Sequence, residues 1–403
     1  MSDLVRILFV DDEPNILSGL KRLMHNMRAS WDMSFAGSAD EALALLEKAP
    51  YDVVVSDMRM PGMDGAQLLD LVRRKHPGTI RVILSGYADS ESVLRTVGPA
   101  HVYLAKPCDP RALQDAITRP MTLRKRLNSP EMQVLLAGLT NLPSLPEVFL
   151  RLKEELQSPN ASAASVAEII SADLAMTAEI LRLTNSAYFS TAMKVTSTAH
   201  AVRMLGMEII QSLVLRIGIF RQFSGPPSGT ALLKDVNEYS LMISKLAEII
   251  AKAEGMDHLV VTQAQCAGML SPVGVLVLLD AKGSVYRNVL SKVGPEKTLY
   301  MVENESFGVN HHLIGAYLLG LWGFKDSLIE AVAFAPNPSQ TEGQENQTLT
   351  AVHAALALGP RFPALPPDLA GAELLDHAYL ARVGRDDRIE TWRELVSATM
   401  SRK

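Results

Sequence analysis

Hydrophobic and polar residues follow a regular pattern over residues 1–119. Short apolar runs, typical of buried strands, are separated by segments with helical spacing. The runs lie at Val5–Val10, Met33–Ala36, Val53–Val55, Val82–Leu84 and His101–Leu104. Because these runs are continuously apolar, they favour a parallel sheet with helices covering both faces. We therefore predict a doubly wound α/β domain with five parallel strands over residues 1–120, since right-handed crossovers lead to that arrangement.

Two helix starts in this region are marked by capping residues. A helix is predicted over 39–49, where Ser38 and Glu41 have the spacing of a capping box. The last helix of the domain should begin at Asp109-Pro110, an N-cap residue followed by proline at the first helical position. The apolar face of the 39–49 helix would comprise Ala42, Leu45, Leu46 and Ala49.

Pro120 marks the end of this pattern. A proline inside a helix predicts a kink or a restart, so we interpret residues 121–132 as a helical linker. Basic residues gather around it, at Arg119, Arg124, Lys125 and Arg126. We interpret them as a solvated face of the linker, with nucleic-acid binding as the alternative.

From residue 133 the apolar residues recur with helical spacing, which predicts an all-helical domain over 133–335. One predicted helix face comprises Ile210, Leu213, Val214, Ile217 and Phe220, and another comprises Tyr239, Ile243, Leu246, Ala247 and Ile250. Residues 336–403 should form a helical extension packed on this domain. Within it we predict an exposed loop over Ser339–Gln347, a helix over Leu349–Leu358, a proline-rich connector (Pro360, Pro363, Pro366 and Pro367) and one or two final helices.

Composition places the chain among ordinary globular proteins of two or three domains. It has 403 residues, of which 48% are hydrophobic and 21% charged, and its net charge of −5 suggests no polyanionic partner. The two cysteines, Cys108 and Cys266, form no disulfide or metal-binding pattern, which fits a reducing cytosol. Cys266–Leu279 is the most apolar stretch and is too short to span a bilayer. We expect no signal peptide, no membrane contact and a cytoplasmic location.

Polar residues that carry chemistry stand where the predicted strands end. Asp11 and Asp12 follow the first strand, and the third, fourth and fifth lead into Asp57, Ser85 and Lys106. The carboxyl ends of the strands in such a sheet meet at one crevice. Three carboxylates held together repel one another unless a cation joins them, and oxygen ligands suit Mg²⁺. One carboxylate would then be free to attack a phosphoryl group whose charge the metal and the lysine neutralise.

These residues, in their order along the chain, resemble the receiver domain of two-component response regulators. The resemblance covers residues 4–120 and lies in Val10-Asp11-Asp12-Glu13-Pro14, in Asp57 with Met60-Pro61-Gly62-Met63-Asp64-Gly65, in Ser85-Gly86 and in Lys106-Pro107. It implies that a sensor histidine kinase or a phosphotransfer protein phosphorylates Asp57. It also implies that the Lys106-Pro107 peptide bond is cis, which only a bond to proline adopts at low cost.

The resemblance assigns a role to each residue of the group. Mg²⁺ would be held by Asp11, Asp12, Asp57 and the backbone carbonyl of Arg59. Ser85 and Lys106 would contact the phosphoryl oxygens, and Tyr103 would be the aromatic switch residue that turns with the Ser85 hydroxyl. Pairing of two copies through the face that bears Tyr103 stays open.

The helical region resembles an HDOD domain, a helical relative of the HD phosphohydrolases. The resemblance lies in Leu142-Pro143-Ser144-Leu145-Pro146-Glu147, Ile170-Ser171-Ala172-Asp173, the segment Leu181 to Phe189, Ala201-Val202-Arg203-Met204-Leu205-Gly206, Gly315-Ala316-Tyr317-Leu318-Leu319 with Trp322-Gly323, and His353. A hydrolytic relative would carry histidine and aspartate ligands around a metal.

This chain departs from the HD enzymes at their metal ligands. The expected His-Asp pair is replaced within Gly268–Gly274, the earlier ligand position falls near Tyr239-Ser240, and the later histidine pair reads Ala335–Pro338. The surviving histidines are His311, His312 and His353. Histidines without carboxylate partners make no hydrolytic metal site, so we interpret them as structural or surface residues and expect no cofactor here.

We therefore interpret the helical domain as a non-catalytic interaction module that binds an unidentified downstream signalling protein. The whole chain is then a phosphoacceptor in a phosphorelay rather than an enzyme. The alternative is a receiver-controlled, metal-dependent phosphohydrolase acting on a cyclic dinucleotide.

Overall fold

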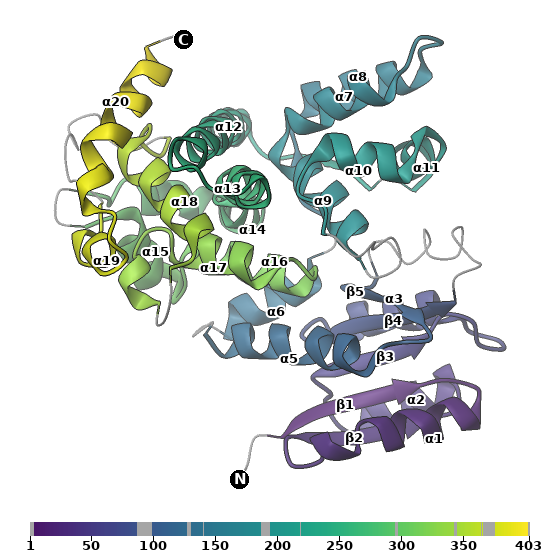
Figure 1. Ribbon diagram of the computed structural model, residues 1–403. Helices are drawn as coiled ribbons and strands as arrows, with labels where there is room; N and C mark the ends of the chain where they lie inside the picture. Colours follow the sequence, from purple (N-terminus) through teal and green to yellow (C-terminus); the bar gives the residue numbers. More distant parts are fainter. Residues whose placement is uncertain are drawn as a thin grey trace.

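The computed structural model has an N-terminal α/β domain followed by a larger helical region (Figure 1). It describes residues 4–86, 99–126, 130–139, 141–186, 194–217, 219–294, 297–341, 345–363, 365 and 375–401. Several segments of the sequence analysis lie outside these residues: the region between the fourth and fifth strands, Tyr188-Phe189 and Pro366-Pro367.

Five parallel strands form the N-terminal sheet, in the order β2-β1-β3-β4-β5. They are β1 Val5–Val10, β2 Trp31–Ala36, β3 Val53–Asp57, β4 Ile80–Gly86 and β5 Val102–Lys106. The predicted doubly wound sheet is therefore confirmed. Its central strands are buried on both faces, as their continuous apolar runs require.

Helices cover both faces of the sheet. Side chains of α1 and α5 join one apolar cluster, and those of α2 and α3 join the cluster on the opposite face. The bounds are α1 Pro14–Leu23, α2 Ala39–Lys48, α3 Gly65–Lys75 and α5 Pro110–Arg126, with a short 3₁₀ turn at His25–Met27.

The predicted capping residues are only partly right. Ser38 Oγ accepts a hydrogen bond from the Glu41 backbone N–H at 3.2 Å, which is one half of a capping box. The Glu41 carboxylate accepts instead from the N–H of Gly37, at 2.7 Å, so the reciprocal half predicted from the sequence is wrong. At α5 the Asp109 carboxylate accepts from the N–H of Ala112 at 3.3 Å, which confirms the predicted N-cap.

Pro120 does not interrupt its helix. α5 continues through it to Arg126, so the predicted restart of the helix is wrong, while the predicted kink stays a prediction. Pro120 is buried, and α5 packs against α16 (His311–Leu321) of the helical region. The packing of this helix on both sides outweighs the loss of one backbone hydrogen bond.

The remainder of the chain is almost entirely helical. The first seven helices are α6 Pro130–Gly138, α7 Pro146–Gln157, α8 Ala163–Ser171, α9 Leu174–Asn185, α10 Thr198–Leu205, α11 Met207–Gln211 and α12 Pro227–Ala253. The later ones are α13 His258–Leu270, α14 Val273–Leu290, α15 Leu299–Phe307, α16 His311–Leu321, α17 Asp326–Phe334, α18 Gln347–Leu358, α19 His377–Arg382 and α20 Ile389–Met400.

One predicted helix face is shorter than expected. α11 ends at Gln211, residues Ser212–Ile217 are π-helical, and Phe220 lies beyond the helix. The chain leaves the helical conformation here because β7 (Arg221–Gln222) pairs with β6 (Pro143–Ser144) in a short parallel ladder. This long-range pairing has no periodic signal in the sequence.

One helical stretch, His258–Leu290, is long and apolar enough to cross a membrane, and 83% of its most apolar window is buried inside the protein. It comprises α13 and α14, which are separated at Pro272, where the sequence predicts a local break. Cys266–Leu279 is buried core, as predicted.

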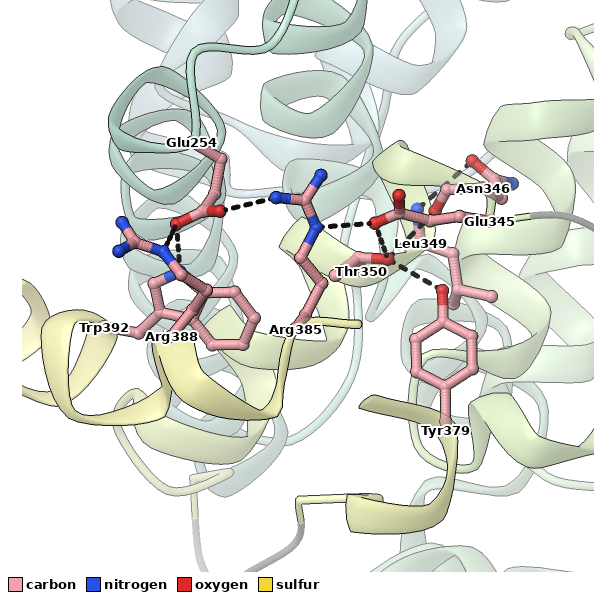
Figure 2. Close-up of polar contacts among 9 residues, drawn as sticks. All are labelled: Glu254, Glu345, Asn346, Leu349, Thr350, Tyr379, Arg385, Arg388 and Trp392. Atoms are coloured by element: carbon pink, nitrogen blue, oxygen red, sulfur yellow. Dashed lines mark hydrogen bonds and ion pairs between the residues drawn. The ribbon is translucent and has the colours of Figure 1, made fainter. Parts of the chain in front are cut away.

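The final helices pack on the helical domain through one buried carboxylate. Glu254, at the end of α12, is only 2% exposed and accepts hydrogen bonds from Arg385 at 3.0 Å and from Arg388 and Trp392 at 2.9 Å (Figure 2). Arg385 also contacts Glu345, before α18, at 3.3 Å. These contacts fasten α19 and α20 to α12 and α18, the helices on which α20 packs.

Gly274 allows α14 and α16 to approach closely, which leads to a testable prediction. A Cβ at Gly274 would lie 2.0 Å from the backbone oxygen of His311. We expect Gly274→Ala to lower the free energy of unfolding by about 3 kcal/mol, because backbone atoms must move apart. The matched control is Gly283→Ala on α14, where a Cβ meets no atom within 4 Å. The control should be neutral or stabilising in urea unfolding, and equal losses for both variants would contradict the prediction.

Candidate functional site

Parallel register places the predicted polar residues along one edge of the sheet. Val10 pairs with Ser56, so Asp11 and Asp57 leave neighbouring strands at the same level. Asp57 pairs with Leu84, and Gly86 with Lys106, which brings Ser85 and Lys106 to the same edge. The crevice predicted from the strand ends is therefore present.

Lys106 joins two of the carboxylates. Its ammonium group lies 2.6 Å from Asp11 and forms an ion pair with Asp57. The other oxygen of Asp57 accepts a hydrogen bond from the backbone N–H of Arg59 at 2.6 Å. Gly65 packs against the Asp57 backbone, where a Cβ would lie 2.0 Å from the carbonyl oxygen. The Asp57 carboxylate is thus held by a cation on one side and a backbone donor on the other.

Burial and charge act in opposite directions on Asp57. Burial raises the pKa of its carboxyl group above the ordinary value, the negative charge of Asp11 adds to the rise, and Lys106 and the Arg59 N–H offset part of it. Burial acts to lower the pKa of Lys106, but hydrogen bonds and charge from Asp11 and Asp57 outweigh it and raise that pKa. The lysine therefore stays charged in the crevice.

Two of the three carboxylates predicted to bind Mg²⁺ lie close together. Asp11 and Asp57 converge on Lys106, and Asp11 also accepts from the N–H of Glu13 at 3.0 Å. Within the described ranges no three histidine, cysteine, aspartate or glutamate side chains form a group that could hold a metal ion by themselves. Two carboxylates with a backbone carbonyl still fit Mg²⁺, which keeps several waters. The magnesium site stays a prediction.

The two predicted switch residues are buried beside the crevice. Ser85, at the end of β4, is 3% exposed, and its hydroxyl is 3.5 Å from the Gly86 carbonyl. Tyr103, on β5, is buried in the cluster on the α2–α3 face, and its hydroxyl donates to the Ala100 carbonyl at 3.3 Å. The Lys106-Pro107 peptide bond is cis, as predicted.

The N-terminal and helical domains meet along α5 and α16, with α5 and α6 lying between the sheet and α16 (Figure 1). On α5, Arg119 donates to the Phe324 carbonyl at 3.0 Å and pairs with Asp326 at 2.8 Å. Arg124 reaches back to the Gly78 carbonyl at 3.2 Å. Two of the basic residues predicted as a solvated linker face are therefore engaged within the protein, which weakens the nucleic-acid alternative.

Two residues at this junction were not singled out by the sequence analysis. Arg81, on β4, is fully buried and donates to backbone carbonyls of Thr79 and Pro99. Tyr317, on α16, is 1% exposed, and burial raises its pKa to about 12, although the nearby charges of Arg124 and Arg81 act to lower it. Among the described residues no hydrogen-bond partner reaches the Tyr317 hydroxyl. The signal in the sequence was an arginine, Arg81, inside an apolar strand. The tyrosine near it, Tyr317, comes from a distant part of the chain and could not be paired with it from the sequence.

The surviving histidines of the helical domain are buried and hydrogen-bonded. His311 Nδ1 lies 2.7 Å from the carboxylate of Glu303, which also accepts from the Tyr286 hydroxyl at 2.7 Å. His312 bonds the Val332 carbonyl through Nδ1 at 3.1 Å, and burial holds its pKa well below the usual value. His353 Nδ1 donates to the Ala335 carbonyl at 2.7 Å. All three histidines are therefore buried rather than at the surface, and His311 has a carboxylate partner that the sequence did not reveal.

Near Tyr239, where HD enzymes are expected to carry their first metal ligand, the neighbouring side chain is aromatic. Phe362 lies between Tyr239 and His311, with ring centroids at 5.4 Å and 5.6 Å. Ser271, in the place of the missing His-Asp pair, is buried and donates to the Gly268 carbonyl at 2.9 Å. The side chains at these two positions are thus an aromatic ring packed on other rings and a hydroxyl bonded within its own helix turn.

Asp173, in one of the motif blocks of the helical domain, has a structural role that predicts a pH dependence. It is 2% exposed and accepts from the N–H groups of Leu145 at 2.7 Å and Met176 at 2.8 Å. Burial raises its pKa to about 6, from an ordinary aspartate value of about 3.9. Between these values the folded state binds more protons than the unfolded state, so the free energy of unfolding should fall as pH rises, by up to about 3 kcal/mol.

Comparing wild type with Asp173→Asn in urea unfolding at several pH values isolates this contribution from other groups. The variant should lack the loss between pH about 4 and about 6. Parallel pH profiles for the two proteins would contradict the prediction.

Two family models match the chain in succession. That of the response regulator receiver domain matches residues 7–118, and that of the HDOD domain matches residues 142–338. The first contains the Asp57 crevice, and the second contains the buried histidines up to α17 but ends before the proline-rich connector and the last two helices.

Curated relatives resemble mainly the N-terminal part. The hydrogenase transcriptional regulatory protein HoxA of Cupriavidus necator is 37% identical over 113 residues, which are 28% of this chain and 23% of HoxA. The response regulator protein PilR of Pseudomonas aeruginosa is 29% identical over 120 residues, 30% of this chain and 26% of PilR. The chain thus spans about a quarter of the length of these relatives.

Among solved structures, the MmoQ response regulator of Methylococcus capsulatus covers 60% of this chain and 97% of its own, with 24% identity and a TM-score of 0.43. The signal receiver domain of an HD domain-containing protein from Pseudomonas fluorescens covers 30% of this chain and 95% of its own, with 31% identity and a TM-score of 0.28.

Proposed function

The chain is a response regulator with an N-terminal receiver domain and a C-terminal HDOD domain, and from this we propose that a sensor histidine kinase or a phosphotransfer protein phosphorylates it on Asp57. The observation that carries the proposal is the convergence of Asp11, Asp57 and Lys106 at the carboxyl edge of the sheet. A buried carboxylate beside a fixed cation is suited to attack a phosphoryl group and to hold its negative charge.

In the proposed reaction an oxygen of Asp57 forms a bond to phosphorus while the bond from phosphorus to the donor breaks. Mg²⁺ bound by Asp11, Asp12, Asp57 and the Arg59 carbonyl would neutralise phosphoryl charge. Lys106 is already placed to bind a phosphoryl oxygen, because its ammonium contacts Asp57. The Ser85 hydroxyl, on the neighbouring strand, would bind another, and Tyr103 would respond to its movement.

The signal would leave the receiver through α5. Lys106 ends β5, and α5 begins four residues later, so a new anion on Asp57 that attracts Lys106 away from Asp11 would pull on the start of this helix. α5 packs on α16, and Arg119 in its second half pairs with Asp326 at the start of α17. We propose that phosphorylation weakens this contact and so changes what the helical domain presents to a partner.

Hydrogen exchange tests this step. With Mg²⁺ and beryllofluoride, a phosphoryl mimic, we expect faster exchange in α16 of the wild type. The matched control is Asp57→Asn, which should exchange in α16 at the same rate with and without beryllofluoride. Unchanged exchange in wild-type α16 at saturating beryllofluoride would contradict transmission through α5.

We further propose that the HDOD domain is non-catalytic and acts by binding a downstream signalling protein in the cytoplasm. The replaced ligands support this, because Tyr239, Phe362 and Ser271 offer no metal-binding set. Turnover of a cyclic dinucleotide by the purified protein with Mn²⁺, lost on substitution of His311 and His353, would instead favour the phosphohydrolase alternative.

A further inference from the structure

A groove runs along α12 beside the proline-rich connector. It holds a cavity of about 240 Å³, lined on the α12 side by Asp235, Glu238 and Tyr239. Pro360, Arg361 and Pro363 line it from the connector. We call residues 360–363 the strap. The remaining volume means that the strap lies in the groove without filling it.

The strap reaches the groove through a close passage at Gly359. A Cβ there would lie 2.3 Å from the Ala355 backbone oxygen and 2.9 Å from the Leu246 side chain of α12. The chain therefore turns off α18 in contact with α12. Beyond the strap, α19 and α20 are fastened separately through Glu254 (Figure 2). Because both flanks are held elsewhere, the strap can leave the groove while the helices around it stay packed.

Phe362 is the anchor of the strap. Its ring meets the Tyr239 ring edge to face at 5.4 Å and lies 5.6 Å from the His311 ring. Glu303 fixes the orientation of His311 through its Nδ1 and its backbone N–H. The groove thus presents a pre-formed aromatic slot made by two helices, α12 and α16.

The acidic residues of α12 and the prolines of the strap indicate what else a segment bound in this groove should contain. Asp235 and Glu238 are exposed one turn apart on α12 and line the cavity together with Arg361. Pro360 and Pro363 restrict the backbone, and a segment with prolines three residues apart favours the extended polyproline conformation. Aromatic-lined grooves bind such segments because little conformational entropy is lost.

We propose that this groove is the docking site of the HDOD domain for a partner protein's proline-flanked segment carrying an arginine and an aromatic residue, and that the strap occupies it until the partner displaces it. The inference rests on the proposed interaction role of this domain and names the chemistry of its partner. The strap itself is the evidence for that chemistry, since it is such a segment seated in the groove.

Binding of a labelled peptide with the sequence of residues 357–363 tests the proposal by fluorescence anisotropy on the full chain. In the wild type the tethered strap competes at an effective concentration of order millimolar, so binding should be weak. Phe362→Ala should empty the slot and tighten peptide binding at least tenfold over wild type. Adding Asp235→Lys and Glu238→Lys, both on exposed positions, should return the affinity to the wild-type level or below.

Two controls make the outcome decisive. A peptide with alanine in place of phenylalanine should not bind any variant, and Leu150→Ala, on exposed α7, should behave as wild type. Circular dichroism and thermal unfolding establish that Phe362→Ala is folded. If folded Phe362→Ala binds the peptide no better than wild type, or if the charge reversal leaves binding unchanged, the docking site is refuted. The assay uses no phosphoryl donor, so its failure would leave phosphorylation of Asp57 intact.

Discussion

Asp57→Asn is expected to reduce incorporation of a phosphoryl group from an acyl phosphate donor by about 100-fold or more, because it removes the nucleophilic oxygen. The amide is nearly isosteric and can still accept from the Arg59 N–H, which donates to the Asp57 carboxylate at 2.6 Å. The variant should therefore stay folded. Phosphorylation would be measured as protein-bound label that hydroxylamine releases, since that reagent cleaves acyl phosphates.

The matched control for this prediction is Asp40→Asn, which changes an exposed carboxylate in the first turn of α2. It should accept the label as the wild type does. Normal labelling of Asp57→Asn would show that another residue is the acceptor, and the receiver assignment of Asp57 would then be wrong.

The second large effect concerns a buried ion pair in α9. Glu179 is fully buried, lies 3.1 Å from Arg182 and accepts from the Leu142 N–H at 3.1 Å. Arg182 lies over the ring of Trp322 at 5.5 Å. We expect Glu179→Ala to lower the free energy of unfolding by about 3–5 kcal/mol, because a buried guanidinium loses its carboxylate and a buried backbone N–H loses its acceptor.

Two comparisons separate this cost from a general loss of charge. Glu305→Ala removes an exposed pair with Lys297, whose side chains are about half exposed, and should cost less than about 1 kcal/mol. The double variant Glu179→Leu with Arg182→Met should recover much of the loss, because it replaces the pair by apolar side chains. Urea unfolding measures all three, and a double variant as unstable as Glu179→Ala would contradict this explanation.

Most structural features that depend on residues close together in the sequence were predicted correctly. β1 has the predicted bounds, and the capped start of α5 follows from two adjacent residues, Asp109 and Pro110. The crevice around Asp57 was also predictable, because parallel strands carry their last residues to one edge of the sheet. Asp11, Asp57 and Lys106 meet there for that topological reason.

Features that depend on partners distant in the chain were missed or wrong. Pro120 was expected to kink or restart a helix, but α5, which packs on α16, runs through it without a restart. The helix predicted to run from Ile210 to Phe220 ends early because β7 pairs with β6.

The fold class, the sheet edge that gathers the polar residues and the absence of the expected HD ligand residues could all be predicted from the sequence, because periodicity, strand ends and residue type are local properties. The side chains that surround Tyr239 and His311 could be found from the three-dimensional packing alone. Phe362 shares no sequence pattern with Tyr239 or His311, and it lies between them because the chain turns off α18 at Gly359 against α12. Contacts between segments distant in the sequence are set by how the helices pack, and one-dimensional periodicity carries no information about them.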